Sequence, residues 1–310
     1  MNVLTWHVHG SYLQSLAAVP VRWVLPYDAG RRGYGGRSAG FPWPSNVIEV
    51  PIGELASCTF DAVVYQHLDH YQRDRAEVLT ARQRAVPAIY IEHDPPRASP
   101  TDSVHPVDDG RTIVVHVTHY NRLMWDTRNP CVVIEHGVPM PARPAGLERR
   151  AGIVVVNHLA RRGRRLGADV FEAARQRLPL DLIGMGADEL GGLGEVPPGD
   201  VVATISGYRF MFSPIRHTSL GLGILEAMAA GVPVVGLATS ELATVVSNGV
   251  NGFVHTDVEQ VYDAGVELLN DRPLALRLGA AARRTVADRF ELARFVDDWS
   301  RLLESAVALG

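Results

Sequence analysis

The chain has 310 residues, a formal net charge of −4 and a hydrophobic content of 46 %. This length suffices for two domains with sizeable cores, and the slightly acidic balance argues against a general nucleic-acid binder. Cys58 and Cys131 are too few for a disulfide framework and fit a reducing cytoplasm. Because the N-terminus lacks a signal-peptide pattern and no stretch approaches the roughly 18 apolar residues of a membrane span, we expect a cytoplasmic protein. Peripheral contact with a membrane stays open.

Short apolar runs bounded by polar residues, Gly or Pro recur along the first half, which is typical of buried parallel strands. They lie at residues 3–8, 21–25, 62–65, 88–91, 113–117 and 132–134. A helical pattern covers residues 68–84. Gly- and Pro-rich stretches predict loops at 30–45 and 95–110 and a linker at 139–146. The first domain is therefore expected at residues 1–145.

The second half restarts the alternation of strands and helices. Strands are predicted at residues 153–157, 180–183, 209–212 and 232–237, and a turn at 248–252. Helices are predicted at residues 167–177, 221–230, 241–247, 258–270, 273–288 and 292–308. This pattern predicts an α/β fold with two doubly wound domains, the second at residues 146–291. In such folds ligands bind at the carboxyl ends of the strands.

The most informative stretch, residues 217–235, predicts a loop, a helix and a strand. Ser219 is a good N-cap, Gly221 keeps the helix start bare, and Gly231 ends the helix. Glu226 is a lone carboxylate in an otherwise apolar helix and needs polar partners, while the free N–H groups of the helix start suit phosphate. The pattern predicts a nucleotide site with its hydroxyls on Glu226. The alternative is an ordinary helix in which local polar groups satisfy that carboxylate.

This stretch resembles the donor-site signature of retaining GT-B glycosyltransferases of the GT4-like family, glycosyl transferases group 1. The family has a Glu, seven residues, a second Glu and then Ala-Met-Ala-x-Gly-x-Pro-Val-Val, and residues 226–235 match the second half. The resemblance implies two Rossmann-like domains facing a central cleft, a last helix at 292–310 that packs back on the first domain, and ribose hydroxyls on Glu226. Thr218 replaces the first Glu, which leaves sugar choice and activity open. The implied donor residues of this loop are Thr218, Ser219, Leu220 and Gly221.

A basic loop at residues 157–165 follows the first strand of the second half, and four Arg in five residues suit a diphosphate clamp. The loop resembles the family's Gly-Arg-Leu…Lys-Gly run. Arg162 takes the Lys position, as it must in a chain whose 30 basic residues are all Arg. His158 takes the Arg position, and the second cation is His158 itself or a neighbouring arginine (Arg161, Arg164 or Arg165). The alternative is a solvated loop or a polyanion patch.

Two further positions extend the implied donor site. Gly184 and Met185 belong to a Gly-x-Gly turn after a strand, which resembles the family's turn near the nucleobase. Arg216 precedes the loop at residues 217–221, here called the signature loop. It either contacts a phosphate or the base, or is an ordinary exposed loop residue.

In the first half, Gly10 follows the first strand and opens a helix, at a place where the family has a glycine loop that can meet a phosphate or sugar. His7 and His9 point to the same side of a strand, and both packing and binding stay open as their role. His93 ends a strand and resembles the family's histidine near the transferred sugar. We expect it to donate to a sugar hydroxyl, with Asp94 orienting it or the acceptor. The alternative is a turn-stabilising His–Asp pair.

Other histidines carry weaker signals. His136 lies in a run at 132–139 that resembles the family's Val-Ile-Pro-Asn-Gly-Val, and a positional role is expected. His116 and His119 flank a strand end but lack a third ligand at close spacing, so no metal is expected.

The sequence thus predicts a retaining glycosyltransferase that moves a sugar from a nucleotide-diphosphate sugar to an acceptor hydroxyl without metal or cofactor. Arg162 and the helix N–H groups would stabilise the leaving diphosphate. Three alternatives stay open: a catalytically impaired nucleotide-sugar-binding or scaffold protein, a sugar-nucleotide epimerase, and a phosphorylase, although the last needs a cofactor-binding lysine that this chain lacks. The base, the sugar, the acceptor and the oligomeric state are not predicted.

Overall fold

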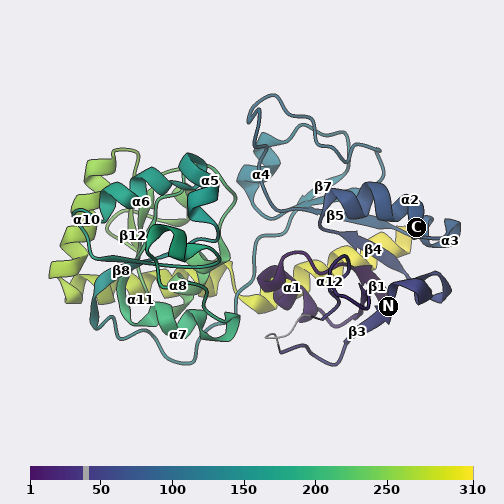
Figure 1. The fold of residues 1–310 in the computed structure, drawn as a ribbon, viewed down its shortest axis with the longest axis horizontal. Helices are drawn as coiled ribbons and strands as arrows, with labels where there is room; N and C mark the ends of the chain where they lie inside the picture. Colours follow the sequence, from purple (N-terminus) through teal and green to yellow (C-terminus); the bar gives the residue numbers. More distant parts are fainter. Residues whose placement is uncertain (38–41, 310) are drawn as a thin grey trace. The chain divides into compact units, whose positions relative to one another are not determined.

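A computed structural model of the chain describes residues 1–37 and 42–309. The chain divides into two compact units, Met1–Gly137 with Leu292–Gly310, and Val138–Glu291 (Figure 1). Each unit is built on one parallel sheet with helices around it. Of the loop expected at residues 30–45, residues 38–41 lie outside the described residues.

The first unit contains a seven-stranded sheet in the order β3-β2-β1-β4-β5-β6-β7, and all its pairs are parallel. The strands are β1 (Asn2–Thr5), β2 (Arg22–Tyr27), β3 (Val47–Pro51), β4 (Ala62–Tyr65), β5 (Ala88–Glu92), β6 (Ile113–His116) and β7 (Cys131–Val133). The chain order reverses at β1, which pairs with both β2 and β4. The carboxyl ends of β1 and β4 therefore form the topological switch point of this sheet, where ligands bind in open α/β folds.

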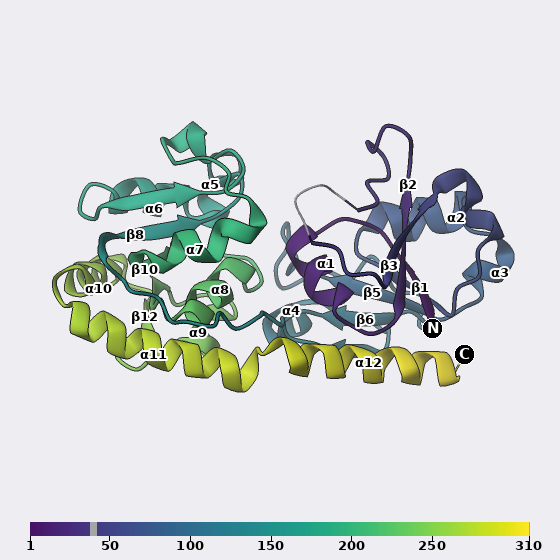
Figure 2. The ribbon, with the colours of Figure 1, turned by 90° about the horizontal axis from the view of Figure 1, so that it is seen from below.

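Helices cover this sheet on both sides: α1 (Gly10–Ala17), α2 (Arg75–Glu77), α3 (Ala81–Arg84), α4 (His119–Met124) and α12 (Leu292–Leu309), with the 3-10 turn η1 (Ile52–Ser57) and the π-helical turn η2 (His70–Asp74). Figure 2 shows α12 along one face of the unit, where it packs against α1 and β4 and buries Phe295 and Trp299. The single helix expected at 68–84 is wrong, because Thr80 starts a separate helix by accepting a hydrogen bond from the Gln83 amide.

The second unit contains a five-stranded sheet in the order β12-β11-β10-β8-β9, again parallel throughout. The strands are β8 (Arg149–Val155), β9 (Leu180–Ile183), β10 (Tyr208–Ser213), β11 (Val234–Leu237) and β12 (Gly252–His255). Here the order reverses between β8 and β10. The basic loop follows β8 and the signature loop follows β10, so both leave the sheet at its switch point.

The helices of the second unit are α5 (Leu159–Leu166), α6 (Ala168–Ala174), α7 (Val201–Ser206), α8 (Leu222–Ala230), α9 (Leu242–Val245), α10 (Val258–Asn270) and α11 (Arg272–Arg289), with two 3-10 turns, η3 (Ala187–Leu190) and η4 (Pro198–Asp200). A core of fully buried side chains, among them Phe171, Phe210, Phe212 and Met228, joins them to the sheet. The pattern missed α7 and the strands β3 and β12, each of which lies at one edge of its sheet.

The Pro-rich segment expected to be a linker lies against the second unit. The Val138 amide donates to the Phe290 carbonyl, and the Ala145 amide donates to the Ala230 carbonyl. Because these bonds tie residues 138–146 to the second unit, the division falls at 137/138 instead of at 145/146. In the described part of the chain, no helix is long and apolar enough to cross a membrane.

Candidate functional site

The signature loop leads from β10 into α8, and the helix begins later than the pattern predicted. Gly221 is the N-cap with extended backbone, and the cap makes no side-chain hydrogen bond. The prediction of Ser219 as N-cap is therefore wrong: Ser219 is buried and its Oγ has no hydrogen-bond partner among the described residues. At the other end Gly231 adopts φ +84° and closes the helix, as predicted.

Glu226 is the distinctive side chain of α8. It is half-buried, and in the described residues its carboxylate makes no hydrogen bond or ion pair. Burial raises the pKa of this carboxyl above its ordinary value. The alternative in which local polar groups satisfy Glu226 is thus wrong, and a polar ligand that reached it would offset the cost of its desolvation.

The basic loop is a short helix, α5, with two special backbone positions. His158 adopts the left-handed conformation, with φ 53°, and Gly163 interrupts the helix with φ 57°. The His158 amide donates to the Met185 carbonyl over 2.6 Å, and the Met185 amide donates to Asn157 Oδ1 over 2.9 Å. The structure therefore brings His158 together with the Gly184–Met185 turn, as the donor-site prediction requires.

Gly184 needs its glycine for a steric reason. Its φ is +132°, and an added Cβ would lie 2.7 Å from the Val156 carbonyl oxygen. The close approach of this turn to the end of β8 leaves no room for a side chain.

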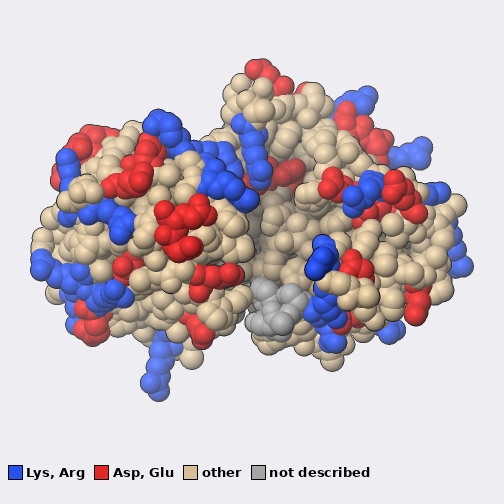
Figure 3. All heavy atoms as spheres, viewed as in Figure 1, with Lys and Arg blue, Asp and Glu red and all other residues tan. Residues whose placement is uncertain are grey.

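The four loop arginines divide into two kinds. Arg161 and Arg162 are exposed, and within the described ranges their side chains have no hydrogen-bond or carboxylate partner. Arg164 pairs with Asp169 at 2.5 Å, and the Arg165 guanidinium donates to the His217 carbonyl over 3.4 Å. Figure 3 shows basic side chains gathered where Figure 1 places α5, with acidic ones spread over the rest of that face. Arg161 and Arg162 are thus free to meet an anion.

The basic loop and the signature loop are fastened to each other. The Arg165 carbonyl accepts the amides of Arg216 and His217, each over 3.1 Å. The Arg216 guanidinium forms two hydrogen bonds with Asp169, of 2.5 and 2.9 Å. Arg216 therefore holds the two loops in register, and any contact with a ligand would come in addition to this.

Thr218 and Leu220 complete the loop. The Thr218 amide lies 3.5 Å from Ser240 Oγ, and Leu220 is buried. The neighbouring buried carboxylate of Glu241 is held by Thr244 Oγ1 at 2.8 Å and by Arg289 at 3.0 Å. The described contacts of Glu241 thus hold it to Thr244 and Arg289.

A second cluster lies at the switch point of the first unit. Gly10 opens α1, as predicted. The preceding residue, His9, packs against His93 with 4.0 Å between their ring centroids. The Tyr12 ring lies 4.8 Å from His93 at a right angle. Burial and the two imidazoles of His9 and His136 lower the pKa of His93 well below its ordinary value. His93 is thus neutral at pH 7.

Asp94 points to another partner. Its carboxylate pairs with Arg97, and its carbonyl accepts the Trp125 indole N–H over 2.8 Å. The described partner of the His93 imidazole is instead Gln66, with Nε2 3.2 Å from Gln66 Oε1. Pattern reasoning missed Gln66, although a polar residue directly after β4 is the signal that could have found it.

The other histidines named above have different surroundings. His7 donates from Nδ1 to the Gly36 carbonyl over 2.8 Å, and His136 packs on Tyr12 at 5.6 Å. His116 is fully buried with both ring nitrogens unpartnered, and burial lowers its pKa to about 3. His119 is exposed. Among the described residues no group of three or more His, Cys, Asp or Glu could hold a metal ion.

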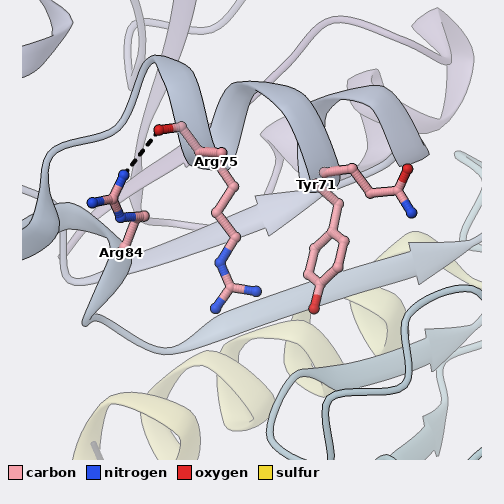
Figure 4. Close-up of a pocket in the computed structure, with 5 residues that line it drawn as sticks. Tyr71, Arg75 and Arg84 are labelled. Atoms are coloured by element: carbon pink, nitrogen blue, oxygen red, sulfur yellow. Dashed lines mark hydrogen bonds between the residues drawn. The ribbon is translucent and has the colours of Figure 1, made fainter.

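A surface hollow of about 490 Å³ lies elsewhere on the first unit (Figure 4). Arg75 stacks over the Tyr71 ring at 5.1 Å and pairs with Asp109, and Arg84 donates to the Ala76 carbonyl over 3.0 Å. No residue of the predicted site lines this hollow, and its arginines are engaged with the protein itself. It is therefore not the candidate site.

Comparisons with known proteins agree with the fold described above. The Anabaena HepE structure in complex with UDP-glucose matches with a TM-score of 0.72 and 14 % identity, over 98 % of this chain and 100 % of that one. The chain therefore has the GT-B fold, built from two Rossmann-like units. Residues 154–271 match the family model described as glycosyl transferases group 1. The match to the family model lies within the second unit, which is therefore similar to the glycosyl transferases of group 1.

Two curated relatives align with part of the chain. N-acetyl-alpha-D-glucosaminyl L-malate synthase of Bacillus anthracis is 33 % identical over 86 residues, which are 27 % of this chain and 23 % of that protein. D-inositol 3-phosphate glycosyltransferase of Corynebacterium aurimucosum is 36 % identical over 88 residues, 28 % of this chain and 21 % of that protein. The match thus spans less than a quarter of either relative.

Proposed function

We propose that this protein is a retaining glycosyltransferase that transfers a sugar from a nucleotide-diphosphate sugar to an acceptor hydroxyl. The observation that carries the proposal is Glu226, a half-buried carboxylate without a partner in the described chain, on a helix whose bare N-terminus lies at the switch point of the sheet. A ribose diol would supply the two hydroxyl donors that this carboxylate lacks.

The donor is bound by the second unit. The diphosphate meets the N–H groups at the start of α8 and the free guanidinium groups of Arg161 and Arg162. The unpartnered Ser219 Oγ is a further group for it, and the base lies by the Gly184–Met185 turn. The UDP-glucose named in the HepE complex makes UDP and UDP-glucose the first probes.

The chemistry rests on positioning and electrostatics. The acceptor hydroxyl attacks the anomeric carbon from the face that the diphosphate leaves, so that the configuration is retained without a covalent enzyme intermediate. Arg162 and the α8 amides stabilise the charge that develops on the leaving diphosphate. Because arginines supply this charge, the reaction is proposed to need no metal ion. In the first unit, Gly10 contributes to donor binding and His93 contacts the transferred sugar, while the acceptor binds to the loops of this unit. The cytoplasm is the proposed location.

A second candidate rests on Thr218. The threonine places no carboxylate where the family has its first Glu, which favours a GT-B protein that binds a nucleotide sugar without transferring it. An epimerase is distinguished from both by its product, a changed nucleotide sugar without loss of UDP.

Calorimetric titration with UDP and with UDP-glucose, with and without EDTA, tests the donor site. The expected result is binding that EDTA does not change, and about ten- to hundredfold weaker binding for Glu226→Gln, because hydrogen bonds to a charged group are lost. Glu172→Gln, at an exposed position of α6, is the control and should bind as the unaltered chain does. Equal affinity of Glu226→Gln would contradict the donor site.

Transfer is measured separately, as UDP release from UDP-glucose in the presence of a panel of hydroxyl acceptors. Release with a product of retained anomeric configuration supports the proposal. Tight donor binding without release or hydrolysis would move the assignment to the binding protein.

A further inference from the structure

Gln66 forms hydrogen bonds both with the residues at the end of β1 and with His93. It follows β4 directly, is 3 % exposed, and lies at the switch point of the sheet. Its Nε2 lies 3.3 Å from both Thr5 Oγ1 and the Trp6 carbonyl oxygen. Its Oε1 lies 3.2 Å from His93 Nε2. Every polar atom of this amide therefore has a partner inside the protein.

The partners determine which way the amide faces. A backbone carbonyl can only accept a hydrogen bond, so the Gln66 nitrogen must point at Trp6. The opposite orientation would bring two acceptor oxygens together. With the nitrogen placed there, Oε1 faces His93, and a carboxamide oxygen can only accept. The proton between Gln66 and His93 must therefore sit on His93 Nε2.

A neutral imidazole carries one proton, so a proton on Nε2 leaves Nδ1 bare. Burial keeps His93 neutral, and the neighbouring imidazoles of His9 and His136 also disfavour a positive charge on it. The Tyr12 ring lies edge-to-face with the His93 ring, at 4.8 Å between centroids, and burial raises the pKa of Tyr12. In the described residues Nδ1 has no hydrogen-bond partner. The free lone pair of His93 is thus available to a ligand.

We propose that Gln66 is a positioning residue that holds His93 as the Nε2–H tautomer, so that His93 accepts a hydrogen bond at Nδ1 from a hydroxyl of the substrate. The identity of that hydroxyl rests on the proposed function, whereas the tautomer does not. This role is the reverse of the expected donation from His93 to a sugar hydroxyl, because the only N–H of the ring is already used by Gln66.

The proposal implies a chemical selectivity. A bare nitrogen prefers a ligand atom that donates, so a hydroxyl is favoured over a fluorine or a methoxy oxygen of similar size at the same point. Among sugars that the enzyme accepts, replacing the contacted hydroxyl by fluorine should weaken kcat/KM by about tenfold, the effect of one hydrogen bond. In a variant whose His93 does not present a bare Nδ1, replacing the same hydroxyl by fluorine should not lower kcat/KM further.

The tautomer is measured directly by long-range ¹H–¹⁵N correlation spectra of the full chain without ligand, in which protonated and bare ring nitrogens separate. His93→Asn identifies the His93 signals among those of the 12 histidines. The expected result at neutral pH is a protonated Nε2 and a bare Nδ1. A protonated Nδ1, or a doubly protonated ring, would overturn the proposal.

The role of Gln66 is tested by Gln66→Met, which has a similar volume and no acceptor. Its His93 signals should shift toward a mixture of the two tautomers. Thr5→Val is the matched control, because the Trp6 carbonyl alone still orients the amide, and its spectrum should keep the Nε2–H tautomer. If Gln66→Met does not fold, Gln66→Glu restores an acceptor toward Nε2 and should keep that tautomer while raising the pKa of His93. An unchanged tautomer in Gln66→Met, or no rise of the His93 pKa in Gln66→Glu, would overturn the proposal.

Kinetics separate this inference from the proposed function. Gln66→Met should lower kcat by about tenfold, the effect of one misplaced hydrogen bond, with little change in the KM for UDP-glucose, and Thr5→Val should lower it far less. The expected tautomer in a protein that turns over no nucleotide sugar would support the role of Gln66 and overturn the transferase. Turnover with the other tautomer would do the reverse.

Discussion

The two units offer different chemistry at equivalent places. At the switch point of the second unit lie free guanidinium groups and a half-buried carboxylate, Arg161, Arg162 and Glu226. At the switch point of the first unit lie imidazoles and an amide, His9, His93 and Gln66, with the pKa of His93 lowered. The first of these edges carries charged groups without a partner in the described chain, whereas the second carries neutral groups that exchange hydrogen bonds. The shared topology sets the place of a site, and the loop residues set its chemistry.

The largest loss of activity is expected from Arg162→Ala, which removes one of the free guanidinium groups of the second unit. Turnover should fall by about 100- to 1,000-fold, the usual cost of removing one group that stabilises developing charge, while the melting temperature changes little because Arg162 is exposed and unpaired in the described chain. Steady-state kinetics measure the effect. Arg277→Ala, an exposed site on α11, is the control, and a similar loss there would remove the special role of Arg162.

Gly167→Ala is expected to separate the basic loop from the signature loop. Gly167 has φ +81°, and an added Cβ would lie 1.9 Å from the Pro214 carbonyl oxygen, so the loops must separate. Urea unfolding should show a loss of about 3 kcal/mol. Gly194→Ala, with φ +87° and nothing within 4 Å of the added carbon, should lose only about 1 kcal/mol. Equal losses would mean that backbone strain alone, without the clash, explains the effect.

The neutral histidines of the first unit predict a dependence of stability on pH. His116 is buried with a folded pKa of about 3, below the value of about 6.5 in an unfolded chain. As pH falls below the unfolded pKa, the unfolded state gains a proton that the folded state refuses, so stability is lost. The unfolding free energy should fall by about 2 kcal/mol more between about pH 6 and pH 4 in the unaltered chain than in His116→Leu. His119→Gln, at an exposed site, should behave as the unaltered chain, and parallel curves for all three would refute the assignment.

The smallest effect is expected from Asp169→Asn. This change weakens the two hydrogen bonds to Arg216 and the pair with Arg164, and it should lower the unfolding free energy by about 1 kcal/mol. The arginines hold the pKa of Asp169 below its ordinary value, so this stabilisation is present at neutral pH and is lost as pH falls through the carboxylate range. Denaturant titrations at two pH values measure it. A stability difference that persisted at low pH would exclude the ion pair as its source.

Local patterns predicted a large part of the fold. The apolar runs located most of the strands, and Gly231 ends α8 where the pattern required. The isolation of Glu226 in an apolar helix was visible without any structure. The pattern erred where neighbouring structure competes with local preference: Ser219 is buried instead of capping α8, and the helix expected at 68–84 breaks before Thr80.

The sequence by itself thus determined the alternation of strands and helices and the residue types in the basic loop and the signature loop, because these depend on spacing along the chain. Only the tertiary structure decided which side chains meet. Gln66 reaches His93 across 27 residues, and Arg216 reaches Asp169 across 47. Such pairs follow from the order of strands in each sheet, which puts the ends of β4 and β5 side by side in the first unit and those of β8 and β10 side by side in the second. No local spacing encodes that order, because it depends on how the whole sheet buries its two faces.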